Sequence, residues 1–289
     1  MNLAGRTCII TGASGGLGRH LAARFWQEGS SLLLAGRSEE ALKIVTESLP
    51  SAPSPGQKWV MCCGDLSNPD AVFSLVAKAK EQFSELTILV NNAAVQGPIG
   101  PIWENDLEHW EETLRLNLLV PARLSAILFT WMAAKSYGKI INISGGGATG
   151  PRARFSAYSA AKAGLIRLTE TLAQEAVPFG VDVNAIAPGV LPTKMLGEIL
   201  AAGSNRAGKA EYENVRKQAN SGEPAFTNVA NLAVFLASAD SDGITGRLIS
   251  AVWDNWQDLA KRKMELQQSD VYTLRRIVAR DRGLDWDDK

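Results

Sequence analysis

Two residues that could exchange a proton with a substrate stand four positions apart in the chain. Tyr158 and Lys162 enclose the sequence Ser-Ala-Ala within a helical pattern, so both side chains project from one face of that helix. A phenol has a reference pKa near 10, and lowering it towards 7 requires about 4 kcal/mol of preferential stabilisation of the phenolate. A neighbouring ammonium gives such stabilisation, and the tyrosine can then act as a general acid or base. An isolated pair of this kind is also typical of a solvated helix surface.

A glycine-rich loop near the N-terminus could hold a phosphate group. Residues 11–18 read Thr-Gly-Ala-Ser-Gly-Gly-Leu-Gly, directly after an apolar run and before a helical pattern. Glycines let the backbone approach a pyrophosphate, and a helix start offers free N–H groups and the positive end of the helix dipole. The spacing departs from G-x-G-x-x-G, and a glycine-rich turn without a ligand is the alternative. Together with the tyrosine and lysine, the loop favours a dinucleotide-dependent enzyme.

The second apolar run ends without a carboxylate. It closes on Ala-Gly-Arg37-Ser38, at the distance from the first run where a residue that recognises ribose is expected. An Asp or Glu would accept hydrogen bonds from the 2′-hydroxyl of NAD, whereas Arg37 and the Ser38 hydroxyl can hold the 2′-phosphate of NADP. We therefore expect NADP to be favoured over NAD. A solvated arginine is the alternative, and Glu39 and Glu40 weaken the phosphate interpretation.

Short apolar runs alternate with helical patterns over the first 190 residues, which predicts βαβ units around a parallel sheet. The fold expected is α/β: a Rossmann-type doubly wound, mainly parallel seven-stranded sheet with helices on both faces. The predicted strands cover residues 7–11, 31–35, 58–63, 88–91, 139–144, 181–186 and 248–252, and the predicted helices cover 17–28, 39–48, 70–83, 107–134, 157–179 and 228–237.

The order of these motifs resembles the short-chain dehydrogenase/reductase family from residue 7 to about residue 193. The matches are Thr11, Gly12, Gly16 and Gly18 for its TGxxxGxG loop, Asp65 for its adenine-side aspartate, Asn91-Asn92-Ala93-Ala94 for its NNAG strand end, Asn117 for its helix asparagine, Tyr158 and Lys162 for its YxxxK pair, and Pro188, Gly189 and Thr193 for its PG turn and following threonine. Only the last glycine of NNAG differs.

The resemblance implies an NAD(P)-dependent oxidoreductase that transfers hydride between the nicotinamide and a carbonyl or alcohol. Tyr158 would be the acid/base, Lys162 would lower its pKa and hold the nicotinamide ribose, Asn117 would keep a helix distorted around water, and Thr193 would meet the carboxamide. The cofactor-binding residues expected are Gly12, Ser14, Gly16, Leu17, Gly18, Arg37, Ser38, Asp65, Leu66, Asn91, Ala93, Tyr158, Lys162, Pro188, Gly189 and Thr193.

The chain departs from the family at the substrate-orienting serine, usually thirteen residues before the tyrosine, where Gly145 stands. Ser144 lies one residue earlier, and alternate strand residues face opposite ways, so a one-place shift normally points the hydroxyl elsewhere. The glycines at 145–147 accept conformations that other residues avoid and could let the backbone turn. We expect Ser144 to be the fourth catalytic residue; a water or a backbone N–H of 145–147 is the alternative.

Two other function classes remain open. A sensor or scaffold could bind the cofactor without turnover, although it has no need of a tyrosine and a lysine on one helix face. A dehydratase or epimerase would use the same residues for proton transfer without net consumption of the reduced cofactor.

Composition excludes several partners. The 289 residues include 30 Lys+Arg and 30 Asp+Glu, so the formal net charge is zero. The overall charge therefore gives no reason to expect a nucleic acid as partner. The sequence shows neither a signal-peptide pattern nor a run of 18 apolar residues, so we expect no membrane association. Cys8, Cys62 and Cys63 form a poor disulfide framework and are expected to be buried thiols in the cytoplasm. With only two histidines, no metal site is expected.

Residues 1–252 are expected to form one dinucleotide-binding and catalytic domain. A polar segment near 194–223 is the predicted substrate lid, with Gly197, Gly203, Gly208 and Gly222 as hinges. Its basic residues are compatible with an anionic carbonyl substrate such as a phosphorylated or nucleotide-linked sugar, or with a solvated lid; they are Lys194, Arg206, Lys209, Arg216 and Lys217.

The last segment, residues 253–289, is predicted to be a helical tail. Val271, Leu274 and Ile277 or Val278 are spaced to form a narrow apolar stripe on such a helix. The family resemblance implies a homodimer or homotetramer, assembled through the two long helices at 107–134 and 157–179. The substrate itself is expected to be a small carbonyl or alcohol.

Overall fold

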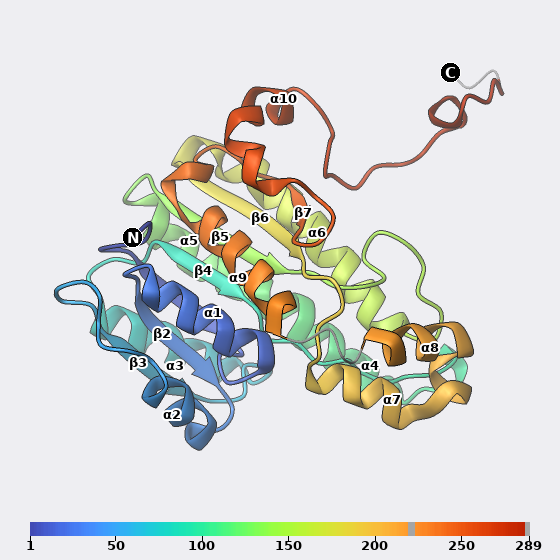
Figure 1. Cartoon of the computed structure of the whole chain (residues 1–289), viewed down its shortest axis with the longest axis horizontal. Coiled ribbons are helices and arrows are strands. Elements are labelled where there is room, and N and C mark those ends of the chain that lie inside the picture. The colour runs from blue at the N-terminus through green and yellow to red at the C-terminus, as the bar shows by residue number, and fades with distance from the viewer. Residues whose placement is uncertain (219–222, 287–289) are drawn as a thin grey trace.

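A single seven-stranded sheet runs through the molecule (Figure 1). The computed structural model describes residues 1–218 and 223–286. All neighbouring strands pair in parallel, in the order β3-β2-β1-β4-β5-β6-β7. The strands are β1 (Thr7–Thr11), β2 (Ser31–Gly36), β3 (Trp59–Cys63), β4 (Ile88–Asn91), β5 (Gly138–Ile143), β6 (Val181–Ala187) and β7 (Leu248–Ser250). The predicted doubly wound fold is confirmed, with strand ends within about two residues of those expected.

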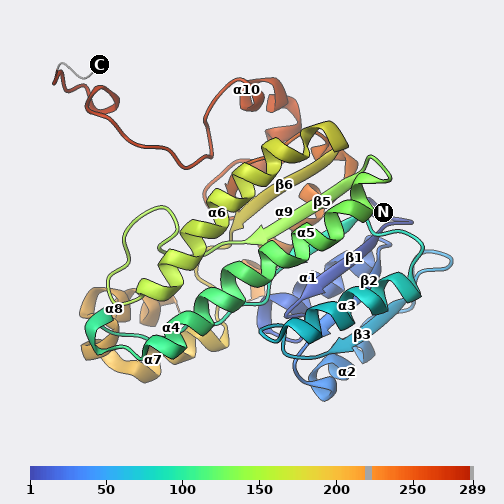
Figure 2. The ribbon, with the colours of Figure 1, turned by 180° about the vertical axis from the view of Figure 1, so that it is seen from behind.

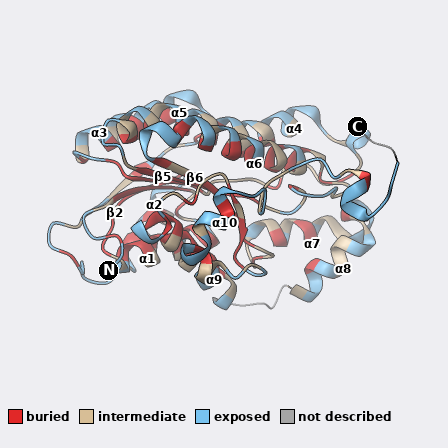
Figure 3. Ribbon diagram, turned by 90° about the horizontal axis from the view of Figure 1, so that it is seen from above, coloured by how far each residue is buried: buried red, intermediate tan, exposed pale blue. Residues whose placement is uncertain are grey.

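Helices cover both faces of the sheet, so the fold has three layers (Figures 2 and 3). One face carries α1 (Gly16–Gln27), α2 (Glu39–Glu47) and α9 (Glu223–Ala237); the other carries α3 (Pro69–Gln82), α4 (Leu107–Leu114), α5 (Val120–Ala133) and α6 (Ser156–Ala176). Polar caps start several of them: Ser38 Oγ accepts from Ala41 N at 3.1 Å before α2, and Asp106 Oδ1 accepts from Glu108 N at 2.8 Å before α4.

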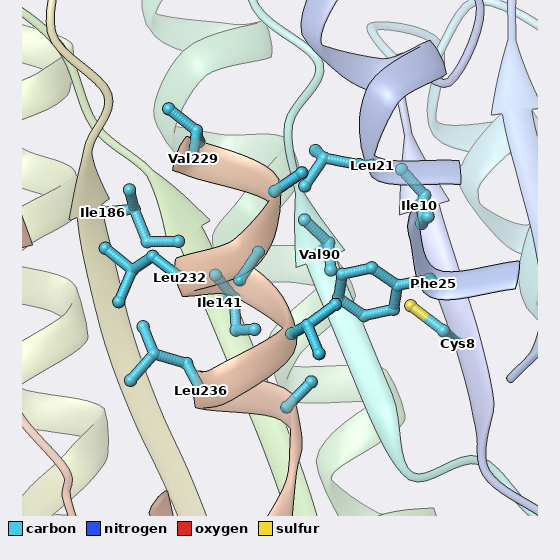
Figure 4. Close-up of a cluster of buried hydrophobic side chains, with 14 of the residues drawn as sticks. Cys8, Ile10, Leu21, Phe25, Val90, Ile141, Ile186, Val229, Leu232 and Leu236 are labelled. Atoms are coloured by element: carbon cyan, nitrogen blue, oxygen red, sulfur yellow. The ribbon is translucent and has the colours of Figure 1, made fainter. Parts of the chain in front are cut away.

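The strands are apolar on both sides because each side faces a helix layer. Cys8 and Ile10 of β1 pack towards α1 and α9, whereas Ile9 between them packs towards α3 and α5. The first cluster joins strands β1, β4, β5 and β6 to the buried faces of α1 and α9, as Figure 4 shows around Phe25 and Leu232. This packing fixes the carboxyl ends of the strands at one edge of the sheet, where the loops that follow them meet.

The predicted long helix at 107–134 is interrupted by a π-helical turn, Arg115–Leu119, between α4 and α5. Within the described residues, this stretch, Leu107–Ala133, has the length and mean hydropathy of a membrane span. It is nevertheless a layer of the fold: α4 packs on α6, and α5 packs on α3 and β5. A core helix of an α/β protein passes the same test of length and composition.

The segment after Thr193, for which the sequence predicted a polar lid but no secondary structure, is helical. It forms α7 (Lys194–Ala207) and α8 (Lys209–Gln218) at the carboxyl end of the sheet (Figure 1). Gly203 interrupts α7 with φ +74°, and Gly208, with φ +85°, separates the two helices, so two of the expected hinges are real breaks. Gly197 lies inside α7, and Gly222 lies outside the described residues. The helices form because their apolar residues pack around buried Phe155, which periodicity within a glycine-rich stretch does not reveal.

The tail is helical only in part, so the prediction of an apolar helical stripe is wrong. Helical turns cover Trp256–Arg262, α10 (Lys263–Gln267) and Ala279–Arg282, but residues 271–278 are not helical. Tertiary contacts explain the difference: Arg247 Nη1 donates to Ser269 O and Val271 O, and Leu274 N donates to Glu170 Oε1. Side chains of the main body thus form hydrogen bonds with the backbone groups that would otherwise pair within a helix.

One cysteine prediction is also wrong. Cys8 and Cys62 are buried, but Cys63 is exposed. Cys63 is the last residue of β3, and β3 is an edge strand of the sheet, so helix packing does not cover it.

Candidate active site

A cavity of about 820 Å³ opens along the carboxyl ends of the strands. That volume is within the range of ligand and cofactor pockets. Most of the predicted site residues line it: Gly12, Ser14, Gly16, Leu17, Gly18, Arg37, Ser38, Asp65, Leu66, Ala93, Ser144, Tyr158, Lys162, Pro188, Gly189 and Thr193. Asn91 and Asn117 belong to the buried interior rather than to this lining.

The glycine loop forms one end of the cavity by close approach of backbone to backbone. Gly12 has φ +65°, and a Cβ built there would lie 2.9 Å from Ala93 Cα. A Cβ at Gly18 would lie 2.1 Å from Gly12 O. Asn92, which matched the strand-end motif but was not among the expected cofactor-binding residues, joins the end of β4 to this loop. Its Nδ2 donates to Thr11 O and Gly12 O at 2.9 and 3.1 Å. The loop leads directly into α1, whose N-terminal N–H groups suit a pyrophosphate.

Beyond the loop lie the residues expected beside the adenosine. Arg37 and Ser38 follow β2, and Asp65 and Leu66 follow β3; all four line the cavity. Asp65 Oδ1 accepts from Ser67 N at 2.9 Å, which fixes that turn. Arg37 is exposed and directly precedes Ser38, the N-cap residue of α2. The residues present therefore fit a dinucleotide.

Tyr158 and Lys162 lie on one face of α6, and both line the cavity. Lys162 Nζ lies 5.7 Å from the Tyr158 ring centroid and donates to Ile143 O at 2.7 Å. Burial raises the pKa of Tyr158 to about 12, and the charge of Arg152 opposes that rise. Burial lowers the pKa of Lys162 to about 7. In this structure the pKa of Tyr158 is thus raised by burial, rather than lowered by Lys162 as the resemblance implied, and the Lys162 amine can gain or lose its proton near pH 7.

A family model for short chain dehydrogenases matches residues 6–203. The chain is 30% identical to the short chain dehydrogenase/reductase dpchG of Colletotrichum higginsianum, over 88% of this chain and 94% of that protein. The chain belongs to the short-chain dehydrogenase/reductase family. This short-chain dehydrogenase is therefore an NAD(P)-dependent oxidoreductase, as predicted.

Two solved structures show what the fold resembles. Levodione reductase aligns with a TM-score of 0.77 and 26% identity, over 89% of this chain and 99% of its own. A putative NAD(P) dependent gluconate 5-dehydrogenase from Beutenbergia cavernae aligns with a TM-score of 0.73 and 27% identity, over 86% and 96%. The relatives are named as dehydrogenases and reductases, which does not favour the sensor or the dehydratase and epimerase alternatives.

Asn117 sits in the π-helical turn of this short-chain dehydrogenase, where the helix is distorted as the resemblance implied. Its side chain bonds to the backbone of Val95: Oδ1 accepts from Val95 N at 2.9 Å, and Nδ2 donates to Val95 O at 2.8 Å. Val95 lines the cavity, so these two hydrogen bonds from Asn117 hold a segment of the cavity wall in place. Asn91 Nδ2 instead donates to Asn142 Oδ1 at 2.8 Å, inside the sheet.

Ser144 stands just beyond β5 and lines the cavity. Its Oγ is buried and has no hydrogen-bond partner among the residues that the structure describes, a state that costs free energy unless a ligand supplies a partner. At Gly145, a Cβ would lie 2.3 Å from Tyr158 Oη. The tyrosine hydroxyl thus fills the space of the side chain that the family's serine would carry.

A charged pair that was not predicted from the sequence lies at the reacting end of the cavity. Arg152, in the loop between β5 and α6, and Glu211, on α8, line the cavity and form an ion pair. The nearness of Arg152 to Tyr158 along the chain was the available signal. Of the five basic lid residues considered as anion ligands, Lys194 alone is among the lining residues that the structure describes. Residues 1–218 and 223–286 contain no cluster of His, Cys, Asp and Glu suited to a metal ion.

Proposed function

We propose that the chain is an NADPH-dependent reductase of a small carbonyl compound, with Tyr158 as the proton donor. The observation that carries this proposal is the meeting of Tyr158 and Lys162 with the glycine loop in one cavity. A glycine loop alone supports binding, and a tyrosine–lysine pair alone supports proton transfer; a reduction by hydride needs both.

Burial raises the pKa of Tyr158 to about 12, so the phenol of the cofactor-free protein carries the proton that a carbonyl oxygen must receive in a reduction. In the reverse reaction the same oxygen would accept the proton of the alcohol. Lys162 Nζ lies 5.7 Å from the centroid of the Tyr158 ring and donates a hydrogen bond to Ile143 O. A protonated Lys162 would stabilise the phenolate left after proton donation.

The residues that would hold the cofactor are those of the cavity lining from the glycine loop to Thr193. When bound, the nicotinamide would supply the hydride, which together with the tyrosine's proton turns C=O into CH–OH. Ser144 Oγ, buried and unpaired among described residues, is proposed to orient the carbonyl oxygen. Pro188 and Gly189 lead into α7 and α8, which we propose as the substrate lid over a catalytic domain of residues 1–252.

Arg37 supports the preference for NADP. Charge-assisted hydrogen bonds from a guanidinium to a phosphate contribute about 1.5–3 kcal/mol. Two similar solved structures point the same way: the putative NAD(P) dependent gluconate 5-dehydrogenase holds NADP at low occupancy, and YwfH is described as an NADPH dependent reductase.

We expect the protein to bind NADPH at least tenfold more tightly than NADH, about 1.4 kcal/mol. An Arg37→Gln variant should lose most of this preference by weakening NADPH binding while NADH binding stays nearly constant. Titration followed by cofactor fluorescence measures both constants. Lys43→Gln is the matched control, since Lys43 is an exposed cation on the adjacent helix that pairs with Glu39. Tighter binding of NADH by the wild type would contradict the assignment of Arg37 to a 2′-phosphate.

We also propose a homodimer or homotetramer in the cytoplasm. Exposed apolar side chains on the α4–α5 stretch, including Leu107 and Leu119, support an interface there, and three free cysteines support a reducing compartment. Sedimentation of the purified protein is expected to give a dimer or tetramer; a monomer at micromolar concentration would contradict the proposed assembly.

A further inference from the structure

Arg152 is the cation that faces the reacting end of the cavity. Its guanidinium carbon lies 3.9 Å from the centroid of the Phe155 ring and 5.9 Å from that of Tyr158, and its side chain is 16% exposed. Stacking on buried Phe155 holds the planar group in place beside the acid/base residue. The loop after β5 passes close to this side chain: a Cβ built at Gly146 would lie 3.7 Å from Arg152 Cδ, and one built at Gly147 would lie 3.2 Å from Arg152 Cβ.

Among the described residues, the other cations that line the cavity lie away from this position or are already paired. Arg37 stands at the adenosine end after β2. Lys162 is buried and donates to Ile143 O. Lys194 is 85% exposed and lies 3.8 Å from Glu198. An anionic group on a substrate whose carbonyl reaches Tyr158 therefore meets Arg152.

A carboxylate already occupies one edge of this guanidinium. Glu211 Oε1, from α8, accepts from Nε at 3.0 Å and from Nη2 at 2.5 Å. One oxygen receives both bonds, although the Nε–Nη2 edge matches the two oxygens of a carboxylate side by side. The position of Glu211 thus shows that a carboxylate can bind at this edge of Arg152, although the two bonds converge on one of its oxygens.

We propose that the Nε–Nη2 edge of Arg152 receives a carboxylate of the substrate, and that Glu211 is an internal competitor which holds α8 on this arginine until the acid displaces it. The substrate class is then an oxo acid, reduced to a hydroxy acid. This inference rests on the proposed reductase function, and it assigns Arg152 and Glu211 to specificity rather than to proton transfer.

The test compares acids with their uncharged esters. The probes are 2-, 3- and 4-oxopentanoate and their methyl esters, with NADPH consumption giving kcat/KM for each. The wild type is expected to favour the acid at one carbonyl position, through KM. Arg152→Gln should reduce that acid-to-ester ratio roughly 10- to 100-fold, the value of a charge-assisted hydrogen-bond pair. Arg152→Lys should reduce it less, because it keeps the charge but not the planar fork.

Glu211→Gln provides the opposite change. Because its amide oxygen is neutral, it competes less for the guanidinium, and the acid should bind roughly 3- to 10-fold more tightly. Lys209→Gln, on the same helix but exposed, is the control and should leave the ratio unchanged. Titration calorimetry of the three acids against each variant gives the same comparison without turnover.

Several outcomes would overturn the proposal. An acid-to-ester ratio of kcat/KM near one for the wild type at all three carbonyl positions would do so. Equal effects of Arg152→Gln and Glu211→Gln on acids and esters would do so as well, because the ion pair would then only hold α8 in place. Reduction of the esters without preference for the acids would leave the reductase function standing. If neither acids nor esters are reduced, the function fails, and calorimetry still decides the site: loss of acid binding in Arg152→Gln supports it, and unchanged binding refutes it.

Discussion

A Tyr158→Phe variant is expected to lose roughly 100- to 10,000-fold in kcat, the usual contribution of a general acid, while its Kd for NADPH stays within about twofold. The substitution removes one oxygen from a buried side chain and leaves the ring that packs between Gly145 and Arg152. The fold and the cavity are therefore preserved. Only the proton that the carbonyl oxygen must receive is lost.

The matched control for this change is Tyr137→Phe. Tyr137 is also partly buried, with burial raising its pKa to about 12, but it precedes β5 at the opposite end of that strand. Its ring lies under Arg6, at 3.9 Å from the guanidinium carbon. Steady-state kinetics and a fluorescence titration of both variants separate catalysis from binding. A Tyr158→Phe variant with wild-type kcat would remove the tyrosine from the mechanism.

Lys162→Met is expected to abolish most of the turnover, by roughly 100-fold or more, and at the same time to stabilise the cofactor-free protein at low pH. Burial lowers the pKa of Lys162 in the folded protein to about 7, against about 10.4 in an unfolded chain. Below about pH 7 the folded protein must therefore hold a buried ammonium. Methionine has a similar length and carries no charge.

The sign of the pH dependence follows from the protons bound. Between about pH 7 and pH 10 the unfolded state keeps the lysine proton and the folded state releases it, so wild-type stability rises with pH by up to about 1.4 kcal/mol per unit. The variant lacks this rise. Its loss of the bond to Ile143 O is independent of pH and leaves the slope unaffected.

Thermal unfolding of both proteins without cofactor, from pH 6 to pH 9, measures this effect. The advantage of Lys162→Met over the wild type should be largest at pH 6 and should shrink as the pH rises. Parallel curves for the two proteins would show that Lys162 is not a buried amine with a lowered pKa.

Local patterns were sufficient for most of the fold. The central strands β1 and β4 are buried on both faces, so each appears in the sequence as a short, mainly apolar run, and both were predicted with their exact bounds. The four-residue spacing of Tyr158 and Lys162 placed them on one helix face for the same local reason.

What the sequence did not reveal depends on contacts between distant segments. The helices α7 and α8 form around Phe155 of another loop, and the tail at 271–278 loses its helix to hydrogen bonds with Arg247 and Glu170. The Arg152–Glu211 pair joins residues 59 positions apart. Asn91 matched a family motif, but its side chain bonds to Asn142 of the neighbouring strand, and strand pairing is not visible in one sequence.

The most direct test of the central claim is the fate of the transferred hydrogen. The protein would be incubated with a carbonyl substrate and NADPH deuterated at C4 of the nicotinamide, on each face in turn, and the alcohol product analysed by mass spectrometry. We predict one deuterium on the carbinol carbon per NADPH consumed, from one face only, and no product from Tyr158→Phe at matched times. Product without deuterium and without loss of NADPH, or tight NADPH binding with no product from any carbonyl compound, would contradict hydride transfer at this site.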